Sequence, residues 1–102
     1  MALNDETTVR DNPSSERYEL LLEEKVIGTI LYDTRPGAVV LIHTDVDQAY
    51  EGRGFGSRLI SGALDDIRER GLTVVPVCRF VRAYLDRHPE YTDLVTREGG
   101  RS

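Results

Sequence analysis

The sequence predicts a mixed α/β (α+β) fold, in which an antiparallel β-meander is followed by a helix, a strand and a second helix. Residues 17–44 contain three β-rich runs separated by turn residues. Residues 57–70 repeat apolar residues at helical spacing, and residues 72–78 return to a short apolar run. A strand, a crossover helix and a strand after a meander form a mixed sheet with helices on its faces.

Three consecutive strands are expected to form the meander, over residues 17–24, 26–33 and 38–44. The first strand places Tyr18, Leu20 and Leu22 on one face. Pro36 and Gly37 follow the second strand and fit a type II turn. The third strand is almost wholly apolar, so we expect it to be covered on both faces.

The helix expected over residues 57–70 has one apolar stripe, made of Leu59, Ile60, Ala63, Leu64 and Ile67. Gly71 suits the left-handed residue that ends a helix. Pro76 cannot donate a ladder hydrogen bond, so pairing of the strand over 72–78 must be broken there on one side. A second helix is expected over residues 79–88, and Pro89 ends it.

Length and composition favour one soluble domain. The chain has 102 residues and a formal net charge of −5. We expect a mobile arm over residues 1–16, which hold few large apolar residues, a folded domain over 17–95 and a mobile tail over 96–102. No apolar run is long enough to span a membrane, and no secretory signal is visible, so a cytoplasmic protein is expected.

Composition also excludes some kinds of site and partner. A single cysteine excludes an internal disulfide and a cysteine-rich zinc site, and we expect no metal. The negative charge argues against a nucleic-acid partner. An anionic cofactor stays possible, because local charge and backbone amides decide its binding.

The most informative stretch is EGRGFGS at residues 51–57, between the third strand and the first helix. Its alternate glycines allow a sharp turn and leave N–H groups free to face a ligand at a helix N-terminus, where anions bind. Arg53 and Arg58 add positive charge. The spacing fits neither Walker A nor the dinucleotide fingerprint. The alternative interpretation is a loop whose glycines serve only a tight turn and close packing.

This loop resembles the acetyl-CoA signature Q/R-x-x-G-x-G/A of the GNAT acyltransferases, with Glu51 in place of the usual Gln or Arg. From about Tyr18 to Val95 the chain is similar to a miniature branch of that superfamily, the YjdJ-type single-domain N-acetyltransferases, in which Glu is usual at this position. The shared landmarks are Arg35-Pro36-Gly37, Leu41-Ile42-His43-Thr44, Glu51-Gly52-Arg53-Gly54, Val75-Pro76-Val77-Cys78 and His88-Pro89-Glu90-Tyr91.

The resemblance implies a compact GNAT fold that binds acetyl-CoA as co-substrate. The third strand and the strand that ends at Cys78 would part, and the pantetheine arm would lie between them. That arm would make strand-like hydrogen bonds near Thr44, Asp45 and Val46. The pyrophosphate would lie on the amides of Gly52, Arg53, Gly54, Phe55, Gly56 and Ser57.

Cys78 allows two interpretations. As an acyl-accepting nucleophile its thiol would need a lowered pKa, which a helix N-terminus with Arg79 and Arg82 would supply. The alternative, which we favour, is a small buried side chain that lines the pantetheine site.

His43 and Tyr84 are the other candidate catalytic residues. His43, at the end of an apolar strand, is a general base in one interpretation and a structural histidine in the other. Resemblance to GNAT enzymes suggests that Tyr84 protonates the leaving thiolate; the alternative, which we favour, is ordinary packing of the helix on the sheet.

We therefore expect an acetyl-CoA-dependent N-acetyltransferase in which an amine attacks the thioester directly. The acceptor would be a small molecule or a protein amine. The second hypothesis is a non-catalytic module that binds CoA or acetyl-CoA without turnover. A monomer or weak dimer is expected.

Overall fold

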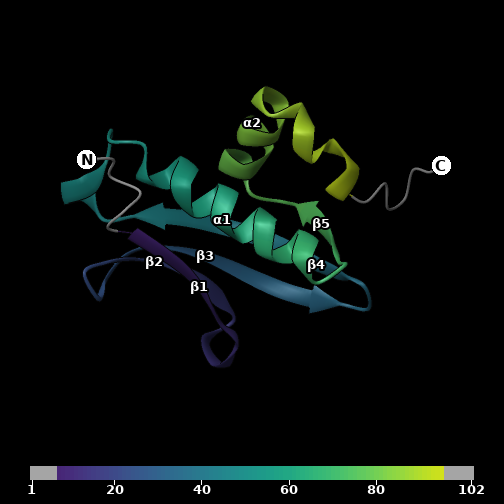
Figure 1. Ribbon diagram of the computed structural model, residues 1–102, viewed down its shortest axis with the longest axis horizontal. Coiled ribbons are helices and arrows are strands. Elements are labelled where there is room, and N and C mark those ends of the chain that lie inside the picture. The colour runs from purple at the N-terminus through teal and green to yellow at the C-terminus, as the bar shows by residue number, and fades with distance from the viewer. Residues whose placement is uncertain (1–6, 96–102) are drawn as a thin grey trace.

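A computed structural model describes residues 7–95 and contains a five-stranded sheet in the order β1-β2-β3-β4-β5. Neighbouring strands from β1 to β4 are antiparallel, whereas β4 and β5 are parallel and are connected through α1 (Figure 1). The predicted mixed fold, a meander followed by helix, strand and helix, is confirmed. The elements are β1 (Thr7–Asn12), β2 (Arg17–Leu22), β3 (Lys25–Arg35), β4 (Ala38–Val46), α1 (Phe55–Glu69), β5 (Thr73–Pro76) and α2 (Arg79–Arg87).

The N-terminal segment corrects one prediction. The mobile arm expected over residues 1–16 is wrong for residues 7–16, because β1 pairs with β2 along its whole length and a short 3-10 helix, Pro13–Ser15, connects them. β1 has one large apolar residue, Val9, so its pattern does not reveal a strand. The folded part therefore begins before residue 17. The tail predicted over residues 96–102 lies outside the described residues.

The other elements follow the predicted order with shifted ends. Gly37 has a φ of 78°, which agrees with the predicted type II turn. The turn between β2 and β3 lies at Glu23 and Glu24, which both have positive φ, so β2 ends two residues before its predicted end at residue 24. α1 begins at Phe55, inside the glycine-rich segment and two residues before the predicted start.

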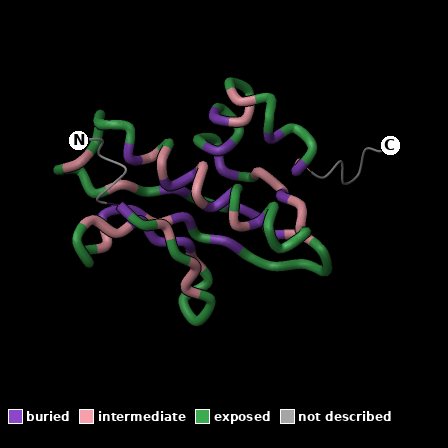
Figure 2. The backbone as a smooth tube through the Cα atoms, in the orientation of Figure 1, coloured by how far each residue is buried: buried purple, intermediate pink, exposed green. Residues whose placement is uncertain are grey.

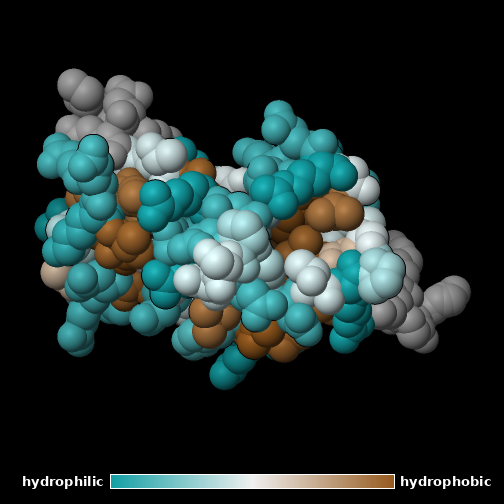
Figure 3. All heavy atoms as spheres, turned by 90° about the horizontal axis from the view of Figure 1, so that it is seen from below, coloured by the Kyte–Doolittle hydropathy of each residue, from teal (hydrophilic) through white to brown (hydrophobic). Residues whose placement is uncertain are grey.

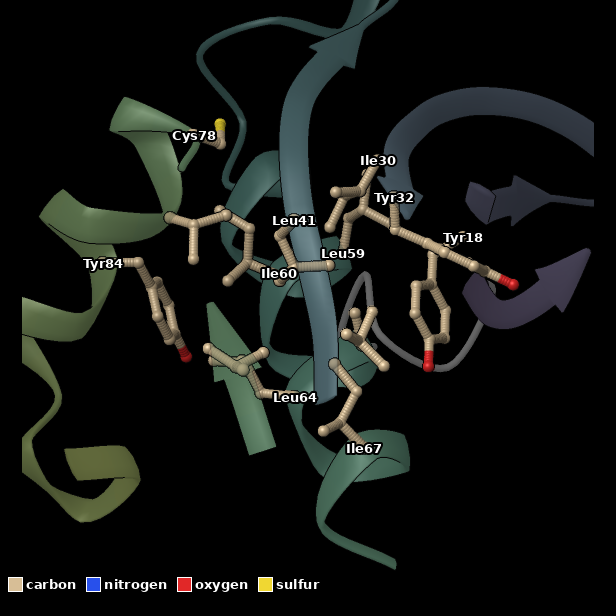
Figure 4. Close-up of a cluster of buried hydrophobic side chains, with 14 of the residues drawn as sticks. Tyr18, Ile30, Tyr32, Leu41, Leu59, Ile60, Leu64, Ile67, Cys78 and Tyr84 are labelled. Carbon is tan, nitrogen blue, oxygen red and sulfur yellow. The ribbon is translucent and has the colours of Figure 1, made fainter. Parts of the chain in front are cut away.

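The core lies between α1 and the sheet, where buried segments of both concentrate (Figure 2). α1 packs against all five strands, and its predicted stripe from Leu59 to Ile67 is buried. These side chains meet Tyr18, Ile30 and Leu41 from three strands (Figure 4). The helical spacing of the apolar residues therefore predicts the buried face of α1 correctly.

The surface carries both hydrophobic and hydrophilic side chains. Among the described residues the exposed large hydrophobic side chains are Leu31, Ile42, Val77 and Phe80. On the face drawn in Figure 3, hydrophobic areas are separated by hydrophilic ones. No helix within residues 7–95 is long and apolar enough to cross a membrane.

A buried carboxylate joins β1 to β2. The Glu19 side chain is 1% exposed and accepts hydrogen bonds from Arg10 Nε at 2.8 Å, Arg17 Nε at 2.8 Å and Asn12 Nδ2 at 3.0 Å. Burial by itself raises the pKa of Glu19, but the hydrogen bonds from Asn12, Arg17 and Arg10 outweigh it and hold this pKa below the ordinary value of 4.5.

This lowered pKa predicts how stability depends on pH. The unfolded state binds the proton more tightly, so the stabilisation by ionised Glu19 is present above about pH 4.5 and is lost as the pH falls through the lowered pKa. We expect Glu19→Gln to lower the free energy of unfolding at pH 7 by about 1–3 kcal/mol. Urea unfolding from pH 7 to pH 3 measures the difference from wild type, which must shrink with acid. A difference that is constant over this range would contradict the prediction.

Candidate functional site

A pocket of about 430 Å³ lies between the end of β4, the segment that leads into α1, and α2. β4 contributes Thr44, Asp45 and Val46 to its wall. The glycine-rich segment and the start of α1 contribute Gly52, Gly54, Phe55, Gly56, Ser57 and Ile60. The structure therefore unites two of the predicted sets, the strand residues and most of the loop residues, in one cavity.

The parting of β4 from β5 opens this pocket towards the sheet. Their ladder ends at the pair Leu41↔Pro76, whereas β4 continues to Val46. The N–H groups of Val77 and Cys78 both donate to the Leu41 carbonyl oxygen, at 3.0 Å and 2.9 Å. Beyond this point β4 has no strand partner on that side among residues 7–95. The separation expected from Pro76 is confirmed.

The free part of β4 presents peptide groups to the opening. The Asp47 N–H donates to the Ile27 carbonyl of β3 at 2.7 Å. Peptide groups alternate in direction along a strand, so those of Thr44 and Val46 face away from β3. Ile42 has no partner in the β3 register, where His43 pairs with Leu31 and Leu41 with Tyr32. Ile42 is therefore the extra residue of a β-bulge. The bulge shifts by one residue the alternation of peptide-group directions between the part of β4 that pairs with β5 and the part beyond it.

The glycine-rich segment offers unpaired N–H groups at a helix N-terminus. Within the described part of the chain, no N–H of residues 52–57 donates a hydrogen bond, and the first N–H that donates to a helical carbonyl is that of Arg58, to Gly54 at 3.1 Å. The amides and the helix dipole together favour an anion at this position.

The structure also shows why glycine is needed in this segment. Gly52 and Gly54 have φ values of 80° and 83°, which side chains rarely adopt. A Cβ at either position would meet no atom within 4 Å. Close packing therefore does not explain these two glycines, whereas the turn conformation does.

α2 forms the opposite wall with four residues at helical spacing, Phe80, Ala83, Tyr84 and Arg87. Phe80 is 68% exposed, an unusual degree for a large aromatic side chain. Sequence reasoning identified only Tyr84 as a site residue on this face. The shared spacing with Tyr84 was the available signal for Phe80 and Arg87.

Tyr84 is the predicted catalytic residue that the structure places in the pocket. It is 7% exposed. Burial raises the pKa of its phenol above the ordinary value of 10.0; a hydrogen bond with Ser61 opposes this rise, and the charges of Glu90 and Asp65 add to it. At neutral pH the group is therefore a protonated phenol that can donate a proton.

Cys78 is buried next to a residue of the pocket wall. Its side chain is 6% exposed, and its sulfur lies 3.3 Å from the Thr44 hydroxyl oxygen. This contact connects the start of α2 to β4. Figure 4 shows Cys78 at the edge of the hydrophobic cluster, near Leu41 and Ile60. Cys78 is not among the residues that line the pocket, whereas Thr44, which its thiol contacts, is one of them.

His43 and Arg53 are not brought into the pocket wall either. His43 is exposed and follows the alternation of β4 to the face opposite Thr44. The role of His43 as a general base stays a prediction, as does the role of Arg53 in binding the cofactor.

Charges around the pocket are mixed. Asp45, Glu51 and Arg87 line it, and Tyr50 adds an aromatic wall that contacts Phe55 edge-on. The ammonium of Lys25, the only lysine in the sequence, lies 5.5 Å from the centre of the Tyr50 ring. Residues 7–95 contain no cluster of three or more His, Cys, Asp or Glu side chains able to hold a metal.

Comparison with known proteins gives one family. The model of the GCN5-related N-acetyl-transferases matches residues 17–94. "Protein NATD1" of Gallus gallus is 34% identical over 82 residues, which cover 80% of this chain and 66% of that protein. The chain thus spans just under two thirds of the length of this relative.

Solved structures show the same fold. A GCN5-like putative N-acetyltransferase from Staphylococcus aureus aligns with a TM-score of 0.67 and 19% identity, covering 89% of each chain. N-acetylglutamate synthase from Neisseria gonorrhoeae, complexed with coenzyme A and N-acetyl-glutamate, aligns with a TM-score of 0.56 and 15% identity. That alignment covers 97% of this chain and 28% of the synthase.

Proposed function

Since the chain belongs to the GCN5-related N-acetyltransferase family, we propose that it is an acetyl-CoA-dependent enzyme that transfers an acetyl group to an amine. One observation supports this most: the opening between β4 and β5 and the unpaired amides of residues 52–57 border the same pocket. An elongated ligand with an anionic end and an amide-containing arm fits this combination. Assignment to the YjdJ-type branch stays a prediction.

The residues present fit acetyl-CoA in distinct ways. The amides of residues 52–57 would hold the pyrophosphate at the start of α1. The outward peptide groups of Thr44 and Val46 would pair with the pantetheine arm as a strand does. Tyr84 would donate a proton to the thiolate that leaves when the amine attacks the thioester carbonyl. His43 remains our candidate for the base that takes the amine proton.

Two measurements test this proposal. Titration with CoA should shift the amide resonances of residues 52–57, and acetyl-CoA should release free thiol with at least one amine in a panel of lysine peptides, N-terminal peptides, polyamines and small amines. Binding without thiol release for any amine would favour the non-catalytic module. Absence of CoA binding would contradict both functions.

We propose direct transfer, because the Cys78 thiol is buried and does not line the pocket. Cys78→Ala is therefore expected to keep turnover within about threefold of wild type. Removal of a covalent nucleophile would instead lower turnover by orders of magnitude. Thiol release measures the rate, and intact mass after incubation with labelled acetyl-CoA tests for an adduct. Cys78→Ser is a matched control that keeps a polar atom near Thr44. An acetyl group on Cys78 together with an inactive Cys78→Ala would contradict direct transfer.

A further inference from the structure

The ring of His88 covers the ring of Tyr84. Their centroids are 3.8 Å apart and their planes differ by 15°, so the rings are stacked. The His88 Nδ1 is also 2.9 Å from the Tyr84 carbonyl oxygen. His88 thus contacts both the side chain and the backbone of the residue that supplies the phenol to the pocket.

The end of α2 explains why His88 takes this position. The His88 N–H donates to the Leu85 carbonyl at 3.2 Å, which leaves the Tyr84 carbonyl without that usual partner. A carbonyl only accepts, so Nδ1 carries the proton and donates to it. Pro89 restricts the backbone of His88, which has φ −132° and ψ 75°. The imidazole is therefore held by its helix end and not only by stacking.

We propose that His88 is a positioning residue that holds the Tyr84 phenol in the pocket for proton donation. The proposal rests on the acetyl transfer proposed above. The Tyr91 ring is a more distant neighbour, tilted and at a centroid distance of 6.1 Å, whereas His88 stacks on the face of the Tyr84 ring. Without His88, the Tyr84 ring gains exposure and freedom to turn about its side-chain bonds.

Three variants separate the two contacts. His88→Ala removes the ring and the hydrogen bond, whereas His88→Phe keeps a ring for stacking and removes the donor. Asp86→Ala, at an exposed position of the same helix, is the matched control. Spectra of protein labelled with ¹³Cζ-tyrosine report the titration of the phenol, and Tyr84→Phe identifies its resonance among the five tyrosines.

In His88→Ala we expect the phenol of Tyr84 to titrate at lower pH than in wild type, because it is less buried. We expect kcat to fall about tenfold, with KM and the Kd for CoA within about twofold, since a misplaced acid affects mainly the chemical step. His88→Phe should lie between wild type and His88→Ala in both readouts. Asp86→Ala should match wild type.

An unchanged Tyr84 titration in His88→Ala would overturn the proposal, as would a loss confined to KM. Should His88→Ala fail to fold, His88→Phe decides by the same readouts. If wild type transfers no acetyl group to any amine, the proposed function fails. The Tyr84 titration then still decides whether His88 controls that phenol.

Discussion

Gly56→Asp is expected to weaken CoA binding about 100-fold or more and to leave the fold intact. Gly56 is in the first turn of α1 and lines the pocket beside the unpaired amides. A carboxylate there would face the pyrophosphate, and two charges about 4 Å apart near a surface repel by about 4 kcal/mol. A Cβ at Gly56 meets only Val46 Cγ2, at an ordinary 3.8 Å, so steric strain is not expected.

The matched control is Gly56→Asn, which has nearly the same shape without the charge. Calorimetric titration with CoA measures the affinities, and thermal unfolding checks the fold. An acidic residue in the first helical turn stabilises a helix by about 0.3–1 kcal/mol, so Gly56→Asp should be at least as stable as Gly56→Asn. Equal CoA affinities of the two variants would show that the anion binds elsewhere.

Gly62→Val is expected to lower the free energy of unfolding by about 3 kcal/mol, at the upper end of usual overpacking costs. A Cβ at Gly62 would lie 2.5 Å from Val9 Cγ2 and 2.7 Å from Val9 Cβ. α1 and β1 therefore approach so closely that a side chain at this position would force them apart.

Urea unfolding measures the loss, and Glu69→Val, at an exposed position of the same helix, is the control and should change stability by about 0.5 kcal/mol or less. Combining Gly62→Val with Val9→Gly should cost less than the sum of the single changes. Full stability of Gly62→Val would mean that β1 does not pack on α1. This tests a strand that lies outside residues 17–94, where the family model matches.

Regular periodicity made the larger elements predictable. The apolar stripe of α1 and the turn at Gly37 follow from residue types alone, and both are confirmed. β1 could not be predicted, because its stability comes from pairing with β2 and from Arg10 and Asn12 binding Glu19. These contacts leave no apolar pattern in the strand itself.

The site was predictable where backbone chemistry defines it and less so where side chains do. Alternate glycines before a helix indicated the free amides of residues 52–57. Thr44 and Val46 came from the resemblance and lie at the same opening. The positions of His43 and Cys78 depend on the strand alternation and on the contact with Thr44, which spacing alone does not fix. Arg87 enters the site because α2 turns the face of Tyr84 towards α1.

The short ladder between β4 and β5 has a consequence for energetics. Within residues 7–95, the ladder between β4 and β5 runs only from Ala38↔Thr73 to Leu41↔Pro76. A ligand bound in the opening would contact both β4 and β5 where their ladder ends. The free energy of unfolding would then rise with the fraction of the protein that has the ligand bound. At a free concentration one hundred times its Kd, such a ligand would raise the free energy of unfolding by about 2.7 kcal/mol. The concentration of this ligand in the cell would then influence what fraction of the protein is unfolded and open to degradation.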